Sequence, residues 1–266
     1  MKKNLVIGNT SQLSHYFPED YIFISSREID YDEILKHEYE STYILFAEQR
    51  TFHPMDLNFF SNVNFSYTVE VIDKLKDISE RVVIYSTSEL WNGYDGAINL
   101  GLKHNYDGTP YINSKKWLSD FINLNRKTYK NVIIIYPFNF NSPYRRKGFL
   151  FESIFSAIIN KEQKTIGNVD FKRDIVHPSI IVRESINASS DKIVGSGILI
   201  DVKRFITDLF DIRGLDVNDY IEFKSDNFLT NKRKEYYCGE KYSNYQELIN
   251  LTNKDINDFI SKRHYQ

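Results

Sequence analysis

A tyrosine and a lysine four residues apart are the residues best placed to do chemistry in this sequence. Tyr111 and Lys115 belong to the run YINSK, and residues four apart lie on one face of a helix. A lysine ammonium beside a phenol stabilises the phenolate, so this pair could move a proton to or from an alcohol or ketone. Thr87, in the run STSEL, could bind the same oxygen through its hydroxyl. These three residues predict a proton-transfer site.

A turn near the amino terminus is typical of dinucleotide binding. The strand-like run NLVIG leads into the segment Gly8-Asn9-Thr10-Ser11-Gln12-Leu13-Ser14. A dinucleotide-binding turn normally carries three glycines, which permit the tight turn, the approach of the pyrophosphate and close helix packing. Only Gly8 is present, and Ser11 and Ser14 occupy the other two places. A plain connection between a strand and a helix is the alternative interpretation.

An arginine follows the second predicted strand, about twenty residues after Gly8. NAD-binding units usually have an acidic residue at this place, where it binds the ribose 2′-hydroxyl. Arg27 could instead pair with the 2′-phosphate of NADP, because a guanidinium matches phosphate geometry. A solvent-exposed arginine at a strand end is the alternative.

The elements that must position these residues alternate between strands and helices. Continuous β-branched runs predict strands buried on both faces: Asn4–Gly8, Tyr21–Ser25, Thr42–Ala47, Arg81–Tyr85 and Asn131–Tyr136. Helical spacing predicts helices over Phe60–Ser79 and Ser114–Tyr129, whereas Ser11–Phe17 and Asp32–His37 are too short for full helices. The predicted fold class is α/β, with a Rossmann-like parallel sheet, flanking helices and a small C-terminal substrate lobe.

The pattern changes after Pro137, where the polar run Asn139–Gly148 suits a crossing into a second lobe. Beyond it we expect a strand over Lys192–Ile200 and helices over Phe149–Lys161, Asp174–Ala188, Val202–Phe210 and about Asn253–Arg263. The run Asn227–Tyr245 is poorly periodic. The expected domains are residues 1–139, with about 174–190, as an NAD(P)-binding domain, and 140–173 with 191–266 as the substrate lobe.

Composition excludes several classes of function. The 34 Lys+Arg and 36 Asp+Glu residues give a net charge of −2, so nothing in the charge favours nucleic acid or a membrane surface. Cys238 is the only cysteine and the six histidines are scattered, so we expect no intramolecular disulfide and no metal. No apolar run approaches the roughly 18 residues of a membrane helix, and the first residues do not form a signal peptide. We expect a soluble, cytoplasmic protein.

Taken together, these motifs resemble the extended short-chain dehydrogenase/reductase family, in its branch of nucleotide-sugar epimerases, dehydratases and reductases. The resemblance extends to about Phe223. The segment Ser86–Leu90 (STSEL) is similar to that of GDP-mannose 4,6-dehydratases, and Tyr111 lies twenty-two residues after Glu89, as in those enzymes. Further similar segments are Pro137-Phe138-Asn139, Asn141-Ser142-Pro143 with Arg145, and Gly167–Asp174. The run Ser26–Asp30 is more similar to the compact dTDP-4-dehydrorhamnose reductases.

The resemblance implies a set of site residues. The catalytic residues would be Thr87, Glu89, Tyr111 and Lys115. The cofactor would be held by Gly8, Thr10, Ser11, Gln12, Leu13, Arg27, Asp30, Ala47, Tyr111, Lys115 and Pro137. A nucleotide-diphosphate sugar would be held by Ser88, Asn139, Arg145 and Arg173. Arg27 favours NADP(H) over NAD(H), and only the resemblance around Gly167–Arg173 favours a GDP-linked sugar. Homodimerisation through the two long helices of the first half is also implied.

The expected function is NADP(H)-dependent reduction of a 4-keto-6-deoxy nucleotide sugar in bacterial surface-polysaccharide biosynthesis. Hydride would come from the nicotinamide and the proton from Tyr111. One alternative is a nucleotide-sugar 4,6-dehydratase or epimerase, which Glu89 favours as the base for the C5 proton. The other is a degenerate, non-catalytic family member, which Ser11 and Ser14 favour.

Overall fold

The computed structural model describes residues 2–47, 57–105, 108–145, 147–224 and 234–263. The chain forms two compact units. Unit 1 comprises Met1–Asn92, Leu100–Pro137 and Ile181–Val194, and unit 2 comprises Gly93–Asn99, Phe138–Ile180 and Gly195–Gln266. Helix α6 (Pro178–Ile186) contains a boundary between the units: residues up to Ile180 belong to unit 2, and residues from Ile181 belong to unit 1.

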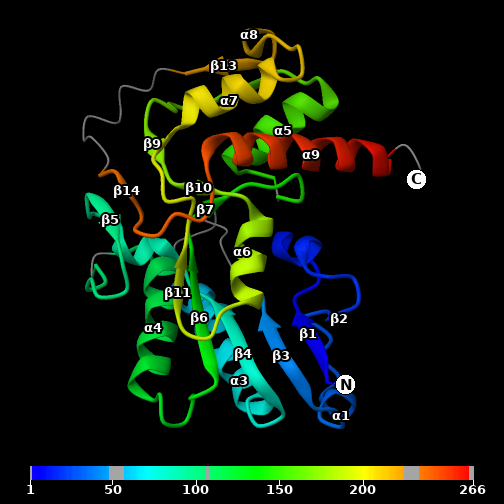
Figure 1. Ribbon diagram of the computed structural model, residues 1–266, viewed down its shortest axis with the longest axis vertical. Helices are drawn as coiled ribbons and strands as arrows, with labels where there is room; N and C mark the ends of the chain where they lie inside the picture. The colour runs from blue at the N-terminus through cyan, green and yellow to red at the C-terminus, as the bar shows by residue number, and fades with distance from the viewer. Residues whose placement is uncertain (1, 48–56, 106–107, 146, 225–233, 264–266) are drawn as a thin grey trace. The chain divides into compact units, whose positions relative to one another are not determined.

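Six parallel strands form the sheet of unit 1 (Figure 1). In spatial order they are β11 (Lys192–Val194), β6 (Val132–Pro137), β4 (Ser79–Tyr85), β3 (Tyr39–Ile44), β1 (Lys3–Ile7) and β2 (Ile22–Ile24). The chain order reverses between β1 and β3, so the carboxyl ends of these two strands form the topological switch point. Ligands of open α/β sheets bind at such a point. The predicted Rossmann-like sheet is confirmed.

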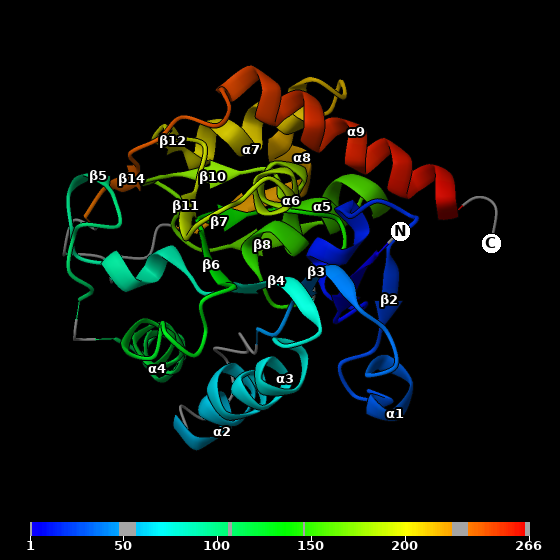
Figure 2. The same ribbon diagram turned by 60° about the horizontal axis from the view of Figure 1, so that its bottom comes forward.

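The helices of unit 1 are mostly short, and α4 is the longest of those that lie wholly within the unit. They are η1 (Gln12–Tyr16), α1 (Tyr31–Ile34), α2 (Leu57–Ser61), η2 (Asn62–Tyr67), α3 (Thr68–Leu75), η3 (Ser88–Trp91) and α4 (Pro110–Leu124). The prediction that Ser11–Phe17 and Asp32–His37 are too short for full helices is confirmed, since η1 and α1 span five and four residues. Figure 2 shows α2 and α4 beside each other, on the same side of the sheet as α3.

The helix predicted over Phe60–Ser79 is three elements rather than one. Its middle part, η2, is a π-helix, and Thr68 donates its hydroxyl to the carbonyl of Val63, five residues back, at 2.8 Å. The helix ends at Leu75 because Ser79 already begins β4. Helix α4 begins four residues earlier than predicted, with Thr109 as its cap and Pro110 as its first residue. A proline fits that place because the first helical N–H has no partner within the helix.

Three predictions for the second half were wrong. The helix expected from Asp174 begins only at Pro178, after the short strands β9 (Lys172–Arg173) and β10 (Ile175–Val176). The strand expected over Lys192–Ile200 is two strands, β11 and β12 (Ile200–Asp201), because Gly197 turns the chain with φ 79°. The last helix, α9 (Tyr245–Arg263), begins eight residues earlier than expected, where Asn244 accepts the amide of Glu247. Residues 227–233 of the run called poorly periodic lie outside the described residues.

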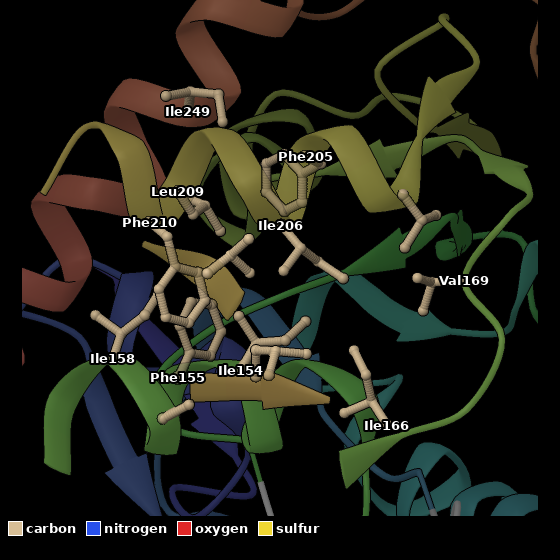
Figure 3. Packing of buried hydrophobic residues seen from close by; sticks show 14 of the residues in the cluster. Ile154, Phe155, Ile158, Ile166, Val169, Phe205, Ile206, Leu209, Phe210 and Ile249 are labelled. Carbon is tan, nitrogen blue, oxygen red and sulfur yellow. The ribbon is translucent and has the colours of Figure 1, made fainter. Parts of the chain in front are cut away.

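Unit 2 is built on α5 (Leu150–Asn160), α7 (Val202–Asp211) and α9, and α5 and α7 confirm two predicted helices. Besides β9, β10 and β12, its other elements are β5 (Gly96–Ile98), β7 (Asn139–Phe140), β8 (Lys164–Ile166), α8 (Val217–Tyr220), β13 (Ile221–Phe223) and β14 (Tyr236–Cys238). Figure 3 shows Phe205, Leu209 and Phe210 of α7 in a cluster with Phe155 and Ile158 of α5. Burial of this apolar stripe is what holds the helices of the unit together.

No helix among the described residues is both long enough and apolar enough to span a membrane.

Candidate functional site

The turn after β1 depends on a glycine. Gly8 has φ 108°, and a Cβ on it would lie 3.2 Å from the Cβ of Leu45. The positive φ favours glycine strongly here, and a side chain would also displace the β3 end by a few tenths of an ångström. The amides of Gly8 and Asn9 donate to the carbonyl of Ile24 at 2.9 and 3.2 Å. These two N–H groups are therefore used within the protein.

The two serines that replace glycines close this turn. Ser11 caps η1 by accepting the amide of Leu13, and the buried Ser14 donates to the carbonyls of Asn9 and Ser11 at 2.8 and 2.6 Å. Leu13 is buried in the core, whereas Thr10 is exposed.

Gln12 provides the group in this turn that most suits a ligand. Its Oε1 atom is buried and has no hydrogen-bond partner among the described residues. A buried acceptor without a donor is unfavourable by about 1–3 kcal/mol, so a bound group that donates to it would be stabilised there.

The residues predicted to hold the adenosine end lie beyond β2 and β3. Arg27 is exposed, three residues after the end of β2, and its backbone amide donates to the hydroxyl of Ser25 at 3.1 Å. Asp30 caps α1 by accepting the amide of Glu33 at 3.1 Å, which gives it a structural role in the turn. Ala47 is exposed, three residues after the end of β3.

The segment after β4 carries the predicted hydroxyl and carboxylate. Thr87 is buried, and its Oγ1 accepts the amide of Glu89 at 3.2 Å, so that it caps η3. Accepting this bond leaves the hydroxyl hydrogen of Thr87 available to a ligand. Ser88 is buried and Glu89 is half-buried.

Lys115 has an environment that the sequence did not predict. Its Nζ donates to the backbone carbonyls of Phe46 and Tyr85 at 2.7 and 2.8 Å, and its side chain is fully buried. These carbonyls lie at the carboxyl ends of β3 and β4, so the amine joins two neighbouring strand ends. Burial lowers the pKa of Lys115 to about 7, because the charged form loses its hydration.

Polar contacts hold α4, which carries Tyr111 and Lys115, in its place. Ser119 donates to the hydroxyl of Ser86 at 2.9 Å, and Asn64 of η2 donates to the hydroxyl of Ser114 at 3.0 Å. Tyr111 is half-buried, and its ring lies 6.3 Å from that of Phe60 at 70°. Because Tyr111 is one turn before Lys115, both side chains start from the same face of α4.

The residues of unit 1 fit a dinucleotide. Gly8 forms the tight turn after β1 with a positive φ, Gln12 offers a buried acceptor without a partner, and Arg27 offers a guanidinium beyond the β2 end. Lys115 uses two of the three N–H groups of its charged form, which leaves one for a ribose hydroxyl. Because Nζ is buried, a ligand can reach it only if the groups that cover it move.

The remaining predicted residues lie at or beyond the end of β6. Pro137 is buried in unit 1 as the last residue of that strand, paired in register with Val194. Asn139, in unit 2, is exposed in β7. Arg145 lies over the ring of Phe149, 4.2 Å from its centroid, and Arg173 lies over the ring of Phe171 at 5.0 Å. The structure thus places the residues predicted to be catalytic or to hold the cofactor in unit 1, and Asn139, Arg145 and Arg173 in unit 2.

Asp174 and His177 serve as connectors within unit 2. The buried carboxylate of Asp174 accepts the amides of Ser196, Gly197 and Cys238 at 2.6 to 3.0 Å. The buried ring of His177 is 2.7 Å from the hydroxyl of Ser179 and 2.9 Å from Asp255. Among the described residues, no group of three or more acidic, histidine or cysteine side chains could hold a metal ion.

Trp91 and its partners were missed from the sequence. Trp91 is fully buried and donates its ring N–H to the carbonyl of Leu102 at 3.0 Å, while its ring meets that of His104 at 4.9 Å. The amide of Asn105 donates to the carbonyl of Leu90 at 2.7 Å. These contacts tie the segment before α4 to η3, and hence the Tyr111 helix to Thr87. A tryptophan directly after STSEL is the only sign of this in the sequence.

Comparison with known proteins shows the fold. No family model and no curated protein matches the chain. A solved UDP-N-acetylglucosamine 4-epimerase from Methanobrevibacter ruminantium, in complex with UDP-N-acetylmuramic acid, matches with TM-score 0.78 and 15% identity over 98% of this chain and 99% of that one. A UDP-glucuronic acid 4-epimerase from Bacillus cereus in complex with NAD matches with TM-score 0.76 and 16% identity over 99% and 100%. RMD from Pseudomonas aeruginosa, complexed with NADPH, matches with TM-score 0.73 and 15% identity over 98% and 100%.

The chain therefore has the fold of nucleotide-sugar epimerases and dehydratases, over essentially its whole length. This is the fold that the sequence resemblance implied.

Proposed function

We propose that the protein is an NADP(H)-dependent reductase of a 4-keto-6-deoxy nucleotide sugar. The observation that carries the proposal is the position of Lys115, whose amine lies at the carboxyl ends of β3 and β4, one helical turn after Tyr111. Thr87 follows the end of the same strand β4. The helix that carries the proton donor thus brings a cation to two adjacent strand ends, one of which leads into the hydroxyl, and ligands of such sheets bind at these ends.

When bound, the nicotinamide supplies the hydride that reduces the C4 carbonyl. The hydroxyl of Thr87 donates a hydrogen bond to the carbonyl oxygen and orients it. Tyr111 gives its phenol proton to that oxygen as negative charge develops on it. Lys115 in its charged form stabilises the resulting phenolate and binds a ribose hydroxyl. Gly8 would form the tight turn beside the cofactor, the buried Gln12 Oε1 would accept a hydrogen bond from a ribose hydroxyl of the cofactor, and Arg27 would bind the 2′-phosphate.

The nucleotide sugar is proposed by analogy with the neighbours in fold, some of which are in complex with UDP-sugars. A GDP-linked sugar rests only on the resemblance of the segment before Asp174, so a panel of GDP-, UDP- and dTDP-linked sugars is needed. We further propose a cytoplasmic enzyme of surface-polysaccharide biosynthesis. We also propose the two domains expected from the sequence: residues 1–139, with about 174–190, would bind NAD(P), and residues 140–173 with 191–266 would bind the substrate.

Replacing Tyr111 by phenylalanine tests the proposal. With NADPH and a 4-keto-6-deoxy nucleotide sugar, the wild type should oxidise one NADPH for each sugar reduced, followed by absorbance at 340 nm. Tyr111→Phe should lower kcat by about 10²–10⁴-fold without changing the unfolding curve. Tyr129→Phe, at a buried tyrosine beyond the other end of α4, is the matched control. Activity of Tyr111→Phe within tenfold of the wild type would remove Tyr111 from the mechanism.

A 4,6-dehydratase or epimerase is the second candidate, and Glu89 favours it. This half-buried carboxylate follows Thr87 directly, at the start of η3, where a base for the C5 proton would be needed. A dehydratase regenerates its cofactor in each turnover. Formation of a 4-keto product from a nucleotide hexose, with no net loss of NADPH, would therefore favour this candidate.

A non-catalytic binding role is the third candidate. The amides of Gly8 and Asn9 are used within the protein and Lys115 is covered, as in a turn that no longer binds a cofactor. Thermal-shift measurements with NADP(H), NAD(H) and the sugar-nucleotide panel separate this role from the enzymatic ones, since a ligand of the folded state raises its melting temperature. A rise with a sugar nucleotide alone would favour a binding protein.

We also propose a homodimer through α2, η2, α3 and α4. Phe60 and Ile122 of these helices are buried within the chain. Others remain accessible on α4, where Trp117 is 43% and Leu124 is 85% exposed. A second copy of these helices would cover them.

A further inference from the structure

Tyr67 joins the ends of the two strands that flank β1. It is the last residue of the π-helical element η2, and its hydroxyl donates to the backbone carbonyl of Ser26 at 2.8 Å. Its ring is stacked on that of Phe46, with 5.1 Å between centroids and 4° between planes. Ser26 lies two residues after the end of β2, and Phe46 two residues after the end of β3. One side chain therefore connects the strand ends on either side of the switch point.

The carbonyl end of this connection belongs to the turn that carries Arg27. That turn is held at two successive backbone groups, because Tyr67 binds the carbonyl of Ser26 and Ser25 accepts the amide of Arg27. Among the residues that the structure describes, the Arg27 guanidinium has no hydrogen-bond or ion-pair partner. The backbone of Arg27 is thus fixed while its charged group remains available.

The ring end of the connection is itself immobilised. Phe46 is buried, and its backbone carbonyl accepts the hydrogen bond from Lys115 at 2.7 Å. Tyr67 therefore sets the Arg27 turn relative to a strand end that Lys115 also fixes. An arginine that binds a phosphate through two parallel hydrogen bonds needs a defined position, and a mobile turn would have to be ordered each time the ligand binds.

We propose that Tyr67 is a positioning residue that sets the preference for the 2′-phosphate of the cofactor, by holding the Ser26–Arg27 turn against the end of β3. The inference rests on the proposed function in one respect, that the chain binds a nicotinamide dinucleotide. Because Tyr67 acts through Arg27, replacing it should weaken the binding only of a ligand that has a 2′-phosphate. NADPH and NADH differ in that group alone.

Tyr67→Phe removes the hydroxyl and leaves the stacked ring. Tyr39→Phe is the matched control, because the Tyr39 hydroxyl also donates to a backbone carbonyl, that of Ile34 at 3.3 Å. Tyr39 is buried at the start of β3, the opposite end of the strand from Phe46. A general effect of losing a tyrosine hydroxyl in unit 1 should appear in both variants.

The primary measurement is the Kd of NADPH and of NADH, by isothermal titration, for the wild type, both tyrosine variants and Arg27→Ala. One hydrogen bond contributes about 1 kcal/mol, so Tyr67→Phe should weaken NADPH binding about fivefold and leave NADH binding unchanged. Tyr39→Phe should leave the ratio of the two Kd values unchanged, and Arg27→Ala should abolish the preference. The inference would be overturned if Tyr67→Phe had the same ratio of NADPH to NADH Kd values as the wild type, or if Tyr39→Phe changed that ratio as much as Tyr67→Phe does.

A second measurement needs no ligand. Amide hydrogen exchange over residues 25–28 should be faster in Tyr67→Phe than in the wild type and unchanged in Tyr39→Phe. Unchanged exchange in Tyr67→Phe would show that the hydroxyl does not hold the turn, whatever the protein binds. Faster exchange in a protein that binds neither dinucleotide would instead overturn the proposed function, and with it the role of Tyr67 in cofactor preference.

Discussion

Replacing Lys115 by methionine removes a buried amine at the centre of the candidate site and should change how stability depends on pH. Burial lowers the pKa of Lys115 to about 7, whereas its ordinary value in an unfolded chain is 10.5. Between these two values the unfolded chain binds a proton that the folded protein does not. The free energy of unfolding therefore rises with pH in this window, and the contribution is absent below about pH 7. The variant has no amine and should lack this rise.

The size of the effect follows from the two pKa values. Within the window, each pH unit changes the free energy of unfolding by about 1.4 kcal/mol. The change between pH 7 and pH 8 is smaller, because Lys115 is only partly deprotonated near pH 7. The difference in unfolding free energy between wild type and variant should thus grow by about 2 kcal/mol from pH 7 to pH 9. The neutral amine keeps two N–H donors, which is the number that the carbonyls of Phe46 and Tyr85 require. Deprotonation therefore removes the buried charge without breaking either hydrogen bond.

Urea unfolding at pH 7, 8 and 9 measures this difference, because other titrating groups contribute equally to both proteins and cancel. The variant also loses both donors, which lowers its stability by an amount that does not depend on pH. Lys127→Met, at an exposed lysine beyond α4, is the control and should follow the wild type at each pH. A constant difference between wild type and Lys115→Met from pH 7 to pH 9 would refute the assignment of a desolvated amine.

Three further predictions concern the cofactor, the core and the assembly. Arg27→Ala should weaken NADPH binding by tenfold or more, because a hydrogen bond to a charged group contributes about 1.5–3 kcal/mol, and should have little effect on NADH binding. If isothermal titration shows equal losses for the two cofactors, the role of Arg27 is structural. Leu209→Ala should lower the free energy of unfolding in urea by about 2–5 kcal/mol, because Leu209 is fully buried in unit 2, whereas Leu124→Ala, 85% exposed, should change it by less than about 0.5 kcal/mol. Light scattering should give the mass of two chains for the wild type and of one for Trp117→Asp; a wild type with the mass of one chain at all concentrations would exclude the dimer.

Local sequence patterns determined the framework of the site. Continuous β-branched runs predicted the strands of the parallel sheet, because a strand covered on both faces must be apolar throughout. The YINSK spacing predicted that Tyr111 and Lys115 share a helix face, and α4 begins just before them. STSEL predicted a hydroxyl after a strand, and Thr87 is there. Each of these features depends on residues within a few positions of one another, so the linear sequence carries it.

The partners of these residues were decided only by the tertiary structure. The amine of Lys115 binds carbonyls 69 and 30 residues away in the chain, and the hydroxyl of Tyr67 binds one 41 residues away. Every residue has a backbone carbonyl, so no residue type marks Phe46, Tyr85 or Ser26 as an acceptor. Which carbonyl meets which donor depends on strand order and on where the π-helical η2 ends. The desolvation that lowers the pKa of Lys115 likewise arises only when the sheet and α4 close around it.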